Sequence, residues 1–282
     1  MVGYCIGSQI PDPSMKPKFI RPIVSSLFIT VTSALLIPGQ ASATDIVWGT
    51  NLGAGPWIWN DGANWTGGTA PVVSTDRGDL RKDWTAAATI NLNAATLVNG
   101  VLFDDTGASS DVGVTIGNGG TAGNTLTLAG TTPAIQASGS TLTTTAVLAG
   151  STAWTKSGAG TLVLNNSANT VTGAITVSAG VLQIRDGSTN TPAFLTAGAL
   201  TGSPITVQNT AILDLPRLHT SGNQNITWSL PSITLEGGSS LRFRASTGSD
   251  THTLGAAIAN SGSTTINSNG GAYSNNINLT GI

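Results

Sequence analysis

The sequence predicts an all-β protein built as a right-handed parallel β-helix, and three observations lead to this fold class. Short runs alternate apolar and polar side chains, which is the period of a strand with one buried face. Glycine, of which the chain holds 36, separates many of these runs. Similar segments recur at a period of roughly thirty residues, as expected of a repeat that buries its apolar face by stacking on its neighbours. Right-handed crossovers are the default for parallel strands.

The composition restricts the classes of function that the chain can have. Charged residues make up 9% of the 282 residues, whereas ordinary domains carry roughly 25%. Hydrophobic residues make up 39%, which argues against disorder because disordered chains combine low hydrophobicity with high net charge. The net charge of −2 and the lack of a basic stripe argue against nucleic acid as a partner. The single cysteine, Cys5, rules out an intrachain disulfide.

The first 43 residues have the layout of a secretory signal peptide. Basic residues from Lys16 to Arg21 precede an apolar run over residues 23–37, and small residues lead up to Ala43. We expect cleavage after Ala43, and therefore the Sec export machinery as a partner; the layout favours Met15 as the true start. A membrane anchor is the alternative, but the run is shorter than the ~20 residues of a spanning helix.

Residues 44–84 form a tryptophan-rich segment that we interpret as a cap on the first rung, where a rung is one circuit of the coiled chain. Terminal repeats of stacked arrays are expected to be atypical, and bulky aromatic side chains can close an open end. Trp57 and Trp59 are two residues apart, so on a strand both would face the same side. The alternative interpretation is a glycan contact made by Trp57 and Trp59.

Two groups of charged residues interrupt this pattern. Residues 76–84 hold six charged side chains and include Arg77-Gly78-Asp79, a tripeptide that can be an integrin ligand when a loop displays it. We interpret this group as a solvated loop with weak ion pairs. Adjacent Asp104 and Asp105 invite comparison with glycosidases, which place carboxylates around a sugar bond. Neighbours on a strand face opposite sides, however, so we interpret this pair as part of a turn before Thr106.

Residues 85–282 are predicted to form the β-helix itself. Apolar positions mark its early strands at Leu97, Val101, Phe103, Val112–Ile116, Thr125–Leu128, Ile135, Leu142 and Val147. Further on, Ser203–Leu215 aligns with Pro231–Phe243 at an offset of 28 residues, with apolar residues kept at alternate positions. Weaker runs around Ile258, Ile266 and Leu279 continue the rhythm. A period of this length suits rungs of about three short strands and gives about eight rungs in the exported part.

The clearest unit of the chain runs from Trp154 to Ile184. It contains three alternating runs, Thr161–Leu164, Ala174–Val177 and Val181–Ile184, and each follows a glycine that permits a sharp corner. We expect these three strands to form one rung. Asn165, Asn166 and Asn169 lie beside a corner, where identical side chains of stacked rungs can form a ladder.

Residues 154–184 also carry a family resemblance. The order W-x-K-x-GAGTLxL, followed by N-x-x-TG-x-x-x-V-x-AG-x-L-x-I, resembles the autotransporter-associated β-strand repeat, also called the passenger-associated transport repeat. The resemblance implies an exported protein, secreted or at the surface of a Gram-negative-type bacterium, whose repeats aid export and folding. It implies an outer-membrane barrel or cell-surface glycans as partners. We expect an N-terminal fragment or a member without a barrel, since neither a barrel nor a sorting tail is recognisable.

The expected function is structural or adhesive display by a passenger-like solenoid. No catalytic, cofactor or metal site is predicted, because His219 and His252 have no ligand spacing between them. A glycan-binding module using Trp57 and Trp59 is the first alternative. A β-helix polysaccharide lyase or hydrolase is less favoured, because the chain has 13 acidic residues in all, and such an enzyme needs several charged residues in one groove.

Overall fold

The computed structural model describes residues 42–49, 52–107, 111–166, 168–185, 203–216, 225–228, 230–244, 251–268 and 276–279. The predicted signal peptide lies outside these ranges except for its last two residues, so its cleavage after Ala43 stays a prediction. The chain divides into two units between Gly39 and Gln40, and every described residue belongs to the second unit. Within the described ranges, no helix has the length and apolar character needed to cross a bilayer.

The second unit is a parallel β-helix with three sides, and all its paired strands run parallel. The first sheet joins, in this order, β1 (Thr44–Val47), β3 (Asp76–Lys82), β6 (Gly100–Asp105), β9 (Ala134–Ala137), β12 (Trp154–Ser157), β15 (Ile175–Val177), β17 (Ile205–Val207), β20 (Ser232–Glu236) and β23 (Ala257–Ser261). The second sheet joins β2 (Trp57–Ile58), β4 (Ala88–Asn91), β7 (Val114–Gly117), β10 (Thr141–Thr144), β13 (Thr161–Leu164), β16 (Val181–Ile184), β18 (Ile212–Pro216), β21 (Ser240–Arg244) and β24 (Thr265–Ser268).

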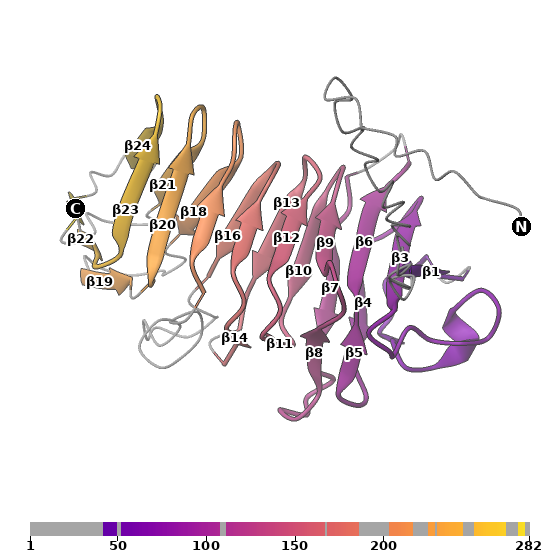
Figure 1. The fold of residues 1–282 in the computed structure, drawn as a ribbon. Helices are drawn as coiled ribbons and strands as arrows, with labels where there is room; N and C mark the ends of the chain where they lie inside the picture. The colour runs from indigo at the N-terminus through magenta and orange to yellow at the C-terminus, as the bar shows by residue number, and fades with distance from the viewer. Residues whose placement is uncertain are drawn as a thin grey trace, which may run out of the picture. The chain divides into compact units, whose positions relative to one another are not determined.

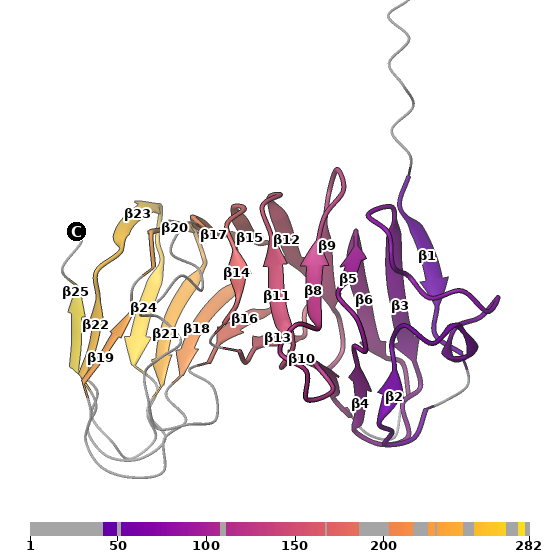
Figure 2. The ribbon, with the colours of Figure 1, turned by 90° about the horizontal axis from the view of Figure 1, so that it is seen from below.

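The third side is described in two parts. A four-stranded sheet holds β5 (Thr96–Val98), β8 (Thr125–Leu128), β11 (Val147–Gly150) and β14 (Thr170–Val171), and a three-stranded sheet holds β19 (Asn225–Trp228), β22 (Thr251–Leu254) and β25 (Asn276–Leu279). Strands of successive rungs lie side by side in chain order (Figures 1 and 2). Together with one 3-10 helix, η1 (Gly62–Asn64), these strands confirm the predicted all-β solenoid.

The register of the first sheet confirms the internal repeat that the sequence predicted. Ile205 pairs with Ile233 and Val207 pairs with Leu235, as the alignment of the two segments requires. The rungs differ in length more than their period suggests. The sequence separation between paired residues is much shorter for Ile135 and Lys156 than for Gly100 and Ala134. The corners therefore absorb large differences in length, because a loop outside the sheets does not disturb the stacking of the strands.

The central stretch spans two rungs, so the prediction that its three strands form one rung is wrong. β13 and β16 are neighbours in the second sheet, with Leu162 opposite Leu182, and β15 belongs to the first sheet. The corners at Gly160 and Gly180 both lead from the first sheet to the second, so the chain repeats one corner instead of completing a circuit. The first two sheets accordingly hold nine strands each, rather than the expected eight.

The core consists of apolar ladders in which each side chain stacks on its equivalent in the next rung. One ladder of the second sheet runs through Ala88, Val114, Leu142, Leu162, Leu182, Leu213, Leu241 and Ile266. All are buried except the last, Ile266, which is 39% exposed at the outermost described rung. Each buried member contributes roughly 1.5–3 kcal/mol to stability, so the ladder accounts for much of the cohesion between rungs.

At the other end, the tryptophan-rich segment covers the first rung. The backbone of residues 64–66 runs antiparallel to the end of β1, with Thr66 N–H donating to Val47 O at 2.8 Å and Gly49 N–H donating to Asn64 O at 2.7 Å. The Trp48 and Trp65 rings meet edge to face, 4.9 Å apart. This segment occupies the edge of the outermost strand of the first sheet, which is what a cap must do.

Asparagine side chains near the corners bond to backbone, not to identical side chains. Asn169 Oδ1 accepts the N–H of Leu148 at 2.7 Å, and Asn166 Nδ2 donates to Thr145 O at 2.8 Å. In both cases the partner belongs to the preceding rung. The expected ladder of identical side chains is therefore replaced by amide groups that complete the backbone hydrogen bonding between unlike corners.

Candidate functional sites

Lys156, the lysine of the central motif, occupies a core position. In the first sheet it lies between Ile135 and Val177, both of which are apolar and buried. Its side chain is 0% exposed. This lysine belongs to the motif W-x-K-x-GAGTLxL, but its burial was not predicted, because a lysine on an alternating strand is ordinarily a surface residue.

The Lys156 ammonium group is held by three backbone carbonyls at two stacked corners. Nζ donates to Gly158 O at 2.6 Å and Gly160 O at 2.7 Å in its own rung, and to Ala179 O at 2.8 Å in the next. The three N–H donors of an ammonium group match these three acceptors. A Cβ at Gly180 would lie 2.6 Å from Nζ, and the φ of +63° there also favours glycine.

Burial sets the proton affinity of this group. Desolvation lowers the pKa of Lys156 to about 8, because removing the charged form from water disfavours it. The amine therefore remains mostly protonated at neutral pH and keeps all three donors. The site is a tie between two rungs, in which the lysine of the first half of the motif contacts the glycine-containing corners of both halves.

The two tryptophans proposed as a glycan contact do not form a shared exposed face. Trp59 is 0% exposed, and its Nε1 donates to Pro71 O at 2.9 Å. Trp57 is half-buried and donates to Gly53 O. Since β2 ends at Ile58, strand alternation does not extend to Trp59, and only Trp57 keeps an indole surface that a sugar could reach.

The charged group at residues 76–84 is largely a strand, so the expectation of a solvated loop is wrong. β3 covers Asp76–Lys82 and lies between β1 and β6. Gly78 faces the interior, where a Cβ would lie 2.4 Å from the Trp59 ring. The glycine thus makes room for the cap, and the Arg77-Gly78-Asp79 tripeptide is part of a paired strand instead of an exposed loop.

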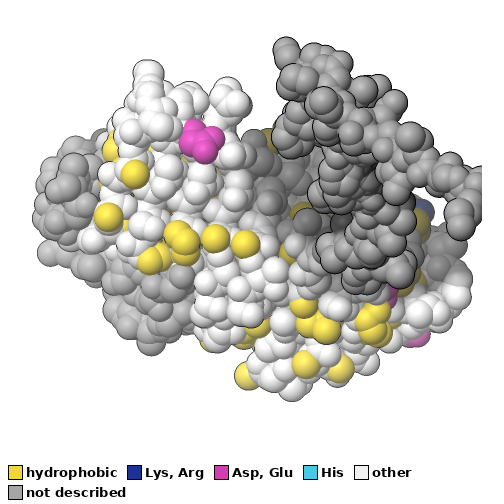
Figure 3. Space-filling model, viewed as in Figure 1, with side chains coloured by type: hydrophobic (Ala, Val, Ile, Leu, Met, Phe, Trp, Pro, Cys, Tyr) yellow, Lys and Arg dark blue, Asp and Glu magenta, His cyan; other side chains and the backbone are white. Residues whose placement is uncertain are grey.

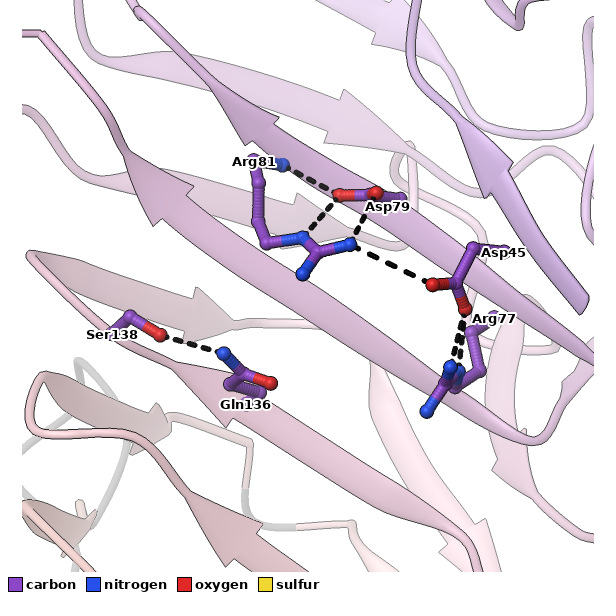
Figure 4. A network of polar contacts seen from close by, with 6 residues as sticks. All are labelled: Asp45, Arg77, Asp79, Arg81, Gln136 and Ser138. Carbon is purple, nitrogen blue, oxygen red and sulfur yellow. Dashed lines mark hydrogen bonds and ion pairs between the residues drawn. The ribbon is translucent and has the colours of Figure 1, made fainter. Parts of the chain in front are cut away.

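The outward side chains of β1 and β3 form an ion-pair network (Figure 4). Arg81 Nη2 lies 2.7 Å from Asp79 Oδ2, and Arg77 Nη2 lies 2.6 Å from Asp45 Oδ1. Burial tends to raise the pKa of Asp79, but hydrogen bonds from the Arg81 side chain and backbone outweigh it and lower the pKa. Asp79 is therefore ionised at neutral pH, which does not suit a general acid.

The Asp104–Asp105 pair ends strand β6 and does not form a turn as predicted. Its two carboxyls face opposite sides, as strand geometry requires. Asp105 is buried and accepts N–H groups from Trp84 at 3.1 Å and Val112 at 2.9 Å. It fixes the corner after β6, so the pair is not arranged for joint action on a sugar bond.

A second polar network lies on the outward side of the second sheet, at Asp214 on β18. Asp214 is buried, and its Oδ1 accepts Arg242 Nε and Arg244 Nε, each at 3.0 Å. Its Oδ2 accepts Gln183 Nε2 at 2.7 Å and also pairs with Arg244 Nη2. Burial raises the pKa of Asp214, but the hydrogen bonds from Arg244, Arg242 and Gln183 together lower it below its usual value. In the sequence, Asp214 and Arg242 stand at equivalent positions of the 28-residue repeat, and the contact between them follows only from the strand pairing.

His252 is a core residue. Its ring stacks on Trp228 with centroids 6.2 Å apart, and its Nδ1 accepts the Trp228 Nε1–H at 3.1 Å. His219, the other histidine considered in the sequence, lies outside the described residues. Across the described ranges, no group of three or more His, Cys, Asp or Glu side chains is arranged to hold a metal ion.

These features define a class of protein: a parallel β-helix of stacked rungs, capped by tryptophans at its first rung and tied internally by buried polar side chains. Residues 155–184 match the family model of the passenger-associated-transport-repeat. The chain therefore carries this repeat, a structural element associated with autotransporter passengers. Comparisons with curated proteins and with solved structures gave no match.

Proposed function

We propose that the chain is the passenger-like part of an exported bacterial protein, which folds outside the inner membrane and presents a β-helical surface at or beyond the cell surface. The match of residues 155–184 to the passenger-associated transport repeat carries the proposal. The parallel coil supports it, because such a coil can form one rung at a time as the chain emerges.

The repeat has a physical part in this process. Two of the carbonyls that hold Lys156 belong to its own rung, and the third, at Ala179, belongs to the rung that follows. The ammonium group is fully paired only after the later rung has docked. The repeat thereby favours the docking of one rung on the next, and opposes their separation.

The surface also suits display. The face in Figure 3 is dominated by uncharged polar side chains and backbone, with small hydrophobic groups and few charged side chains in its described part. Such a surface exerts little long-range electrostatic attraction on other macromolecules. A sugar contact by Trp57 is a secondary candidate, favoured by its half-buried indole.

The test is to produce the full chain in a Gram-negative host, fractionate the cells and determine the N-terminus by mass spectrometry. We expect an exported chain that begins at Thr44, and digestion by protease added to intact cells if the host supplies a suitable outer-membrane partner. A signal-region variant with Lys16 and Lys18 changed to Glu is the matched control and should stay inside. An unprocessed wild-type chain in the cytosol would contradict the proposal.

A further inference from the structure

Charge is divided unequally along the described chain. Described residues up to Asp111 include eight acidic and three basic side chains, whereas those from Val112 onward include two acidic and four basic ones. One of the four, Lys156, is enclosed in the core. The positive charge that remains lies on Arg185, Arg242 and Arg244, and each is an outward or corner residue of the second sheet.

The strand register brings two of these arginines onto one carboxylate. Asp214 lies opposite Gln183 on one side and Arg242 on the other, and Arg244 follows Arg242 by two residues, so both arginines face outward. Within the described part of the chain, Asp214 is the one carboxylate paired with either arginine. Among the described residues, one buried negative charge therefore serves two guanidinium groups, and one positive charge exceeds the negative charge that pairs with them.

The geometry leaves hydrogen-bond donors facing outward. Arg242 uses only Nε towards Asp214, and Arg244 uses Nε and Nη2. The Arg242 and Arg244 side chains remain 24% and 34% exposed. A fixed, partly exposed guanidinium group is well suited to a carboxylate or sulfate, because its planar donors match two oxygens and little rotamer entropy is lost.

We propose that Arg242 and Arg244, held in place by Asp214, form a binding site for an acidic polysaccharide. The anionic group of the sugar takes the guanidinium donors that Asp214 leaves, and the exposed Asn267, opposite Arg242 in the next rung, offers a neutral partner to a sugar hydroxyl. The acidic first rungs repel the same polymer, so binding is confined to the later rungs. The inference rests on the proposed function in one respect, namely that the chain encounters the polymer outside the cell.

The test is binding of the purified chain to polygalacturonate, dextran sulfate, neutral dextran and single-stranded DNA, by calorimetry at low and high salt. We expect binding to the two acidic polysaccharides, weakening with salt, and none to dextran. The preference between the two identifies carboxylate or sulfate as the group recognised. Equal or tighter binding of the DNA, or no binding of either acidic polysaccharide, would overturn the proposal.

Variants locate the site. R242Q with R244Q should lower affinity at least about tenfold, since a charged hydrogen bond is worth about 1.5–3 kcal/mol and 1.4 kcal/mol is tenfold. R77Q, which removes an arginine from the first sheet, is the matched control and should bind as the wild type does. If the double variant unfolds, R244K is used instead, because it keeps a positive charge beside Asp214 but lacks the planar guanidinium group. In the wild type, NMR of 15N-labelled arginine side chains reports the contact directly. Arginine signals that do not shift on adding polygalacturonate or dextran sulfate would refute the site.

Discussion

Lys156 and Asp214 are the two charged side chains of the described residues that are 0% exposed, and they are buried in opposite ways. Lys156 points into the apolar core and has only backbone carbonyls as partners. Asp214 points away from the core, is buried by its neighbours and is compensated by two arginines. Burial alone therefore does not determine how a charge behaves. The carbonyl dipoles do not offset the desolvation of the lysine, so its pKa is lowered to about 8. The full charges of the two arginines do offset the burial of the aspartate and keep it ionised.

The largest expected effect concerns Asp214. D214N leaves Arg242 and Arg244 partly buried without a carboxylate, and removing one partner of a buried ion pair costs about 3–5 kcal/mol. Urea unfolding followed by tryptophan fluorescence measures the loss. E236Q, an acid-to-amide change on strand β20 of the first sheet, is the control and should shift stability by no more than about 0.5 kcal/mol.

A second change tests whether the loss comes from the unpaired arginines. Adding R242M and R244M to D214N removes the orphaned charges and should recover a large part of the stability, because apolar groups can replace a buried ion pair at little cost. A triple variant as unstable as D214N would show that the carboxylate matters for another reason. Compensation by the two arginines would then not explain how Asp214 differs from Lys156.

The next largest effect is on the pH dependence of stability. The unfolded chain holds the Lys156 proton up to its ordinary pKa of 10.5, whereas the folded chain releases it near 8. Between these values the unfolded state binds more protons, so this lysine makes stability rise with pH, by up to about 3 kcal/mol over the window. K156M cannot titrate there and should lack this rise. A parallel pH dependence of the two proteins would show that the lysine titrates normally.

Asp214 also makes stability rise with pH, but in the acidic range. Because its folded pKa is lowered, its contribution is complete above the ordinary aspartate pKa of about 3.9 and is lost as the pH falls through its folded value. The two buried charges thus act at opposite ends of the pH range. Stability curves measured across both ranges separate them without any further substitution.

A smaller effect is expected for K156M at neutral pH. Methionine keeps most of the volume of the stem, so the cavity is small, but the carbonyls of Gly158, Gly160 and Ala179 lose their donor. Unsatisfied buried acceptors cost about 1–3 kcal/mol, and the loss of the desolvated ammonium offsets part of this. Hydrogen exchange should show faster opening of β13 and β16 than of β4, and uniform change along the coil would contradict a local tie.

The sequence predicted the architecture well because apolar spacing and a repeat are direct consequences of stacking. The pairing of Ile205 with Ile233 follows from that pattern alone. The rung boundaries were mispredicted, since two equivalent corners twenty residues apart resemble one circuit when only their strands are considered. Rung lengths differ because corner loops are free to vary, and no local pattern records their length.

The candidate sites were less predictable, because each depends on register between distant residues. From the sequence, Gly78 is predicted to lie in a charged loop, and only the structure shows that the Trp59 ring packs against it. In the sequence, Arg242 and Asp214 are simply different residues at equivalent outward positions, and only the strand pairing places them side by side. Lys156 could have been found from one signal: it stands two residues after Trp154, at a position that alternation assigns to the core. A charged residue on an inward position indicates a buried tie or a site.

The smallest predicted effect extends the comparison to an exposed charge pair. Arg77 and Asp45 on the first sheet are each about one-third exposed, so water screens their attraction, and exposed pairs typically contribute about 0.2–1 kcal/mol. R77Q should therefore lower stability by no more than that amount, and the difference from wild type should vanish in about 1 M salt, where the screening length is only a few ångströms. D214N should keep most of its larger deficit at the same salt concentration, because the Asp214 carboxylate that it replaces is fully buried and buried pairs are screened much less than exposed ones. Urea midpoints for both variants at low and high salt make the measurement. A salt-independent loss at Arg77, or a loss at Asp214 that salt abolishes, would mean that partner charge and not burial distinguishes the two sites.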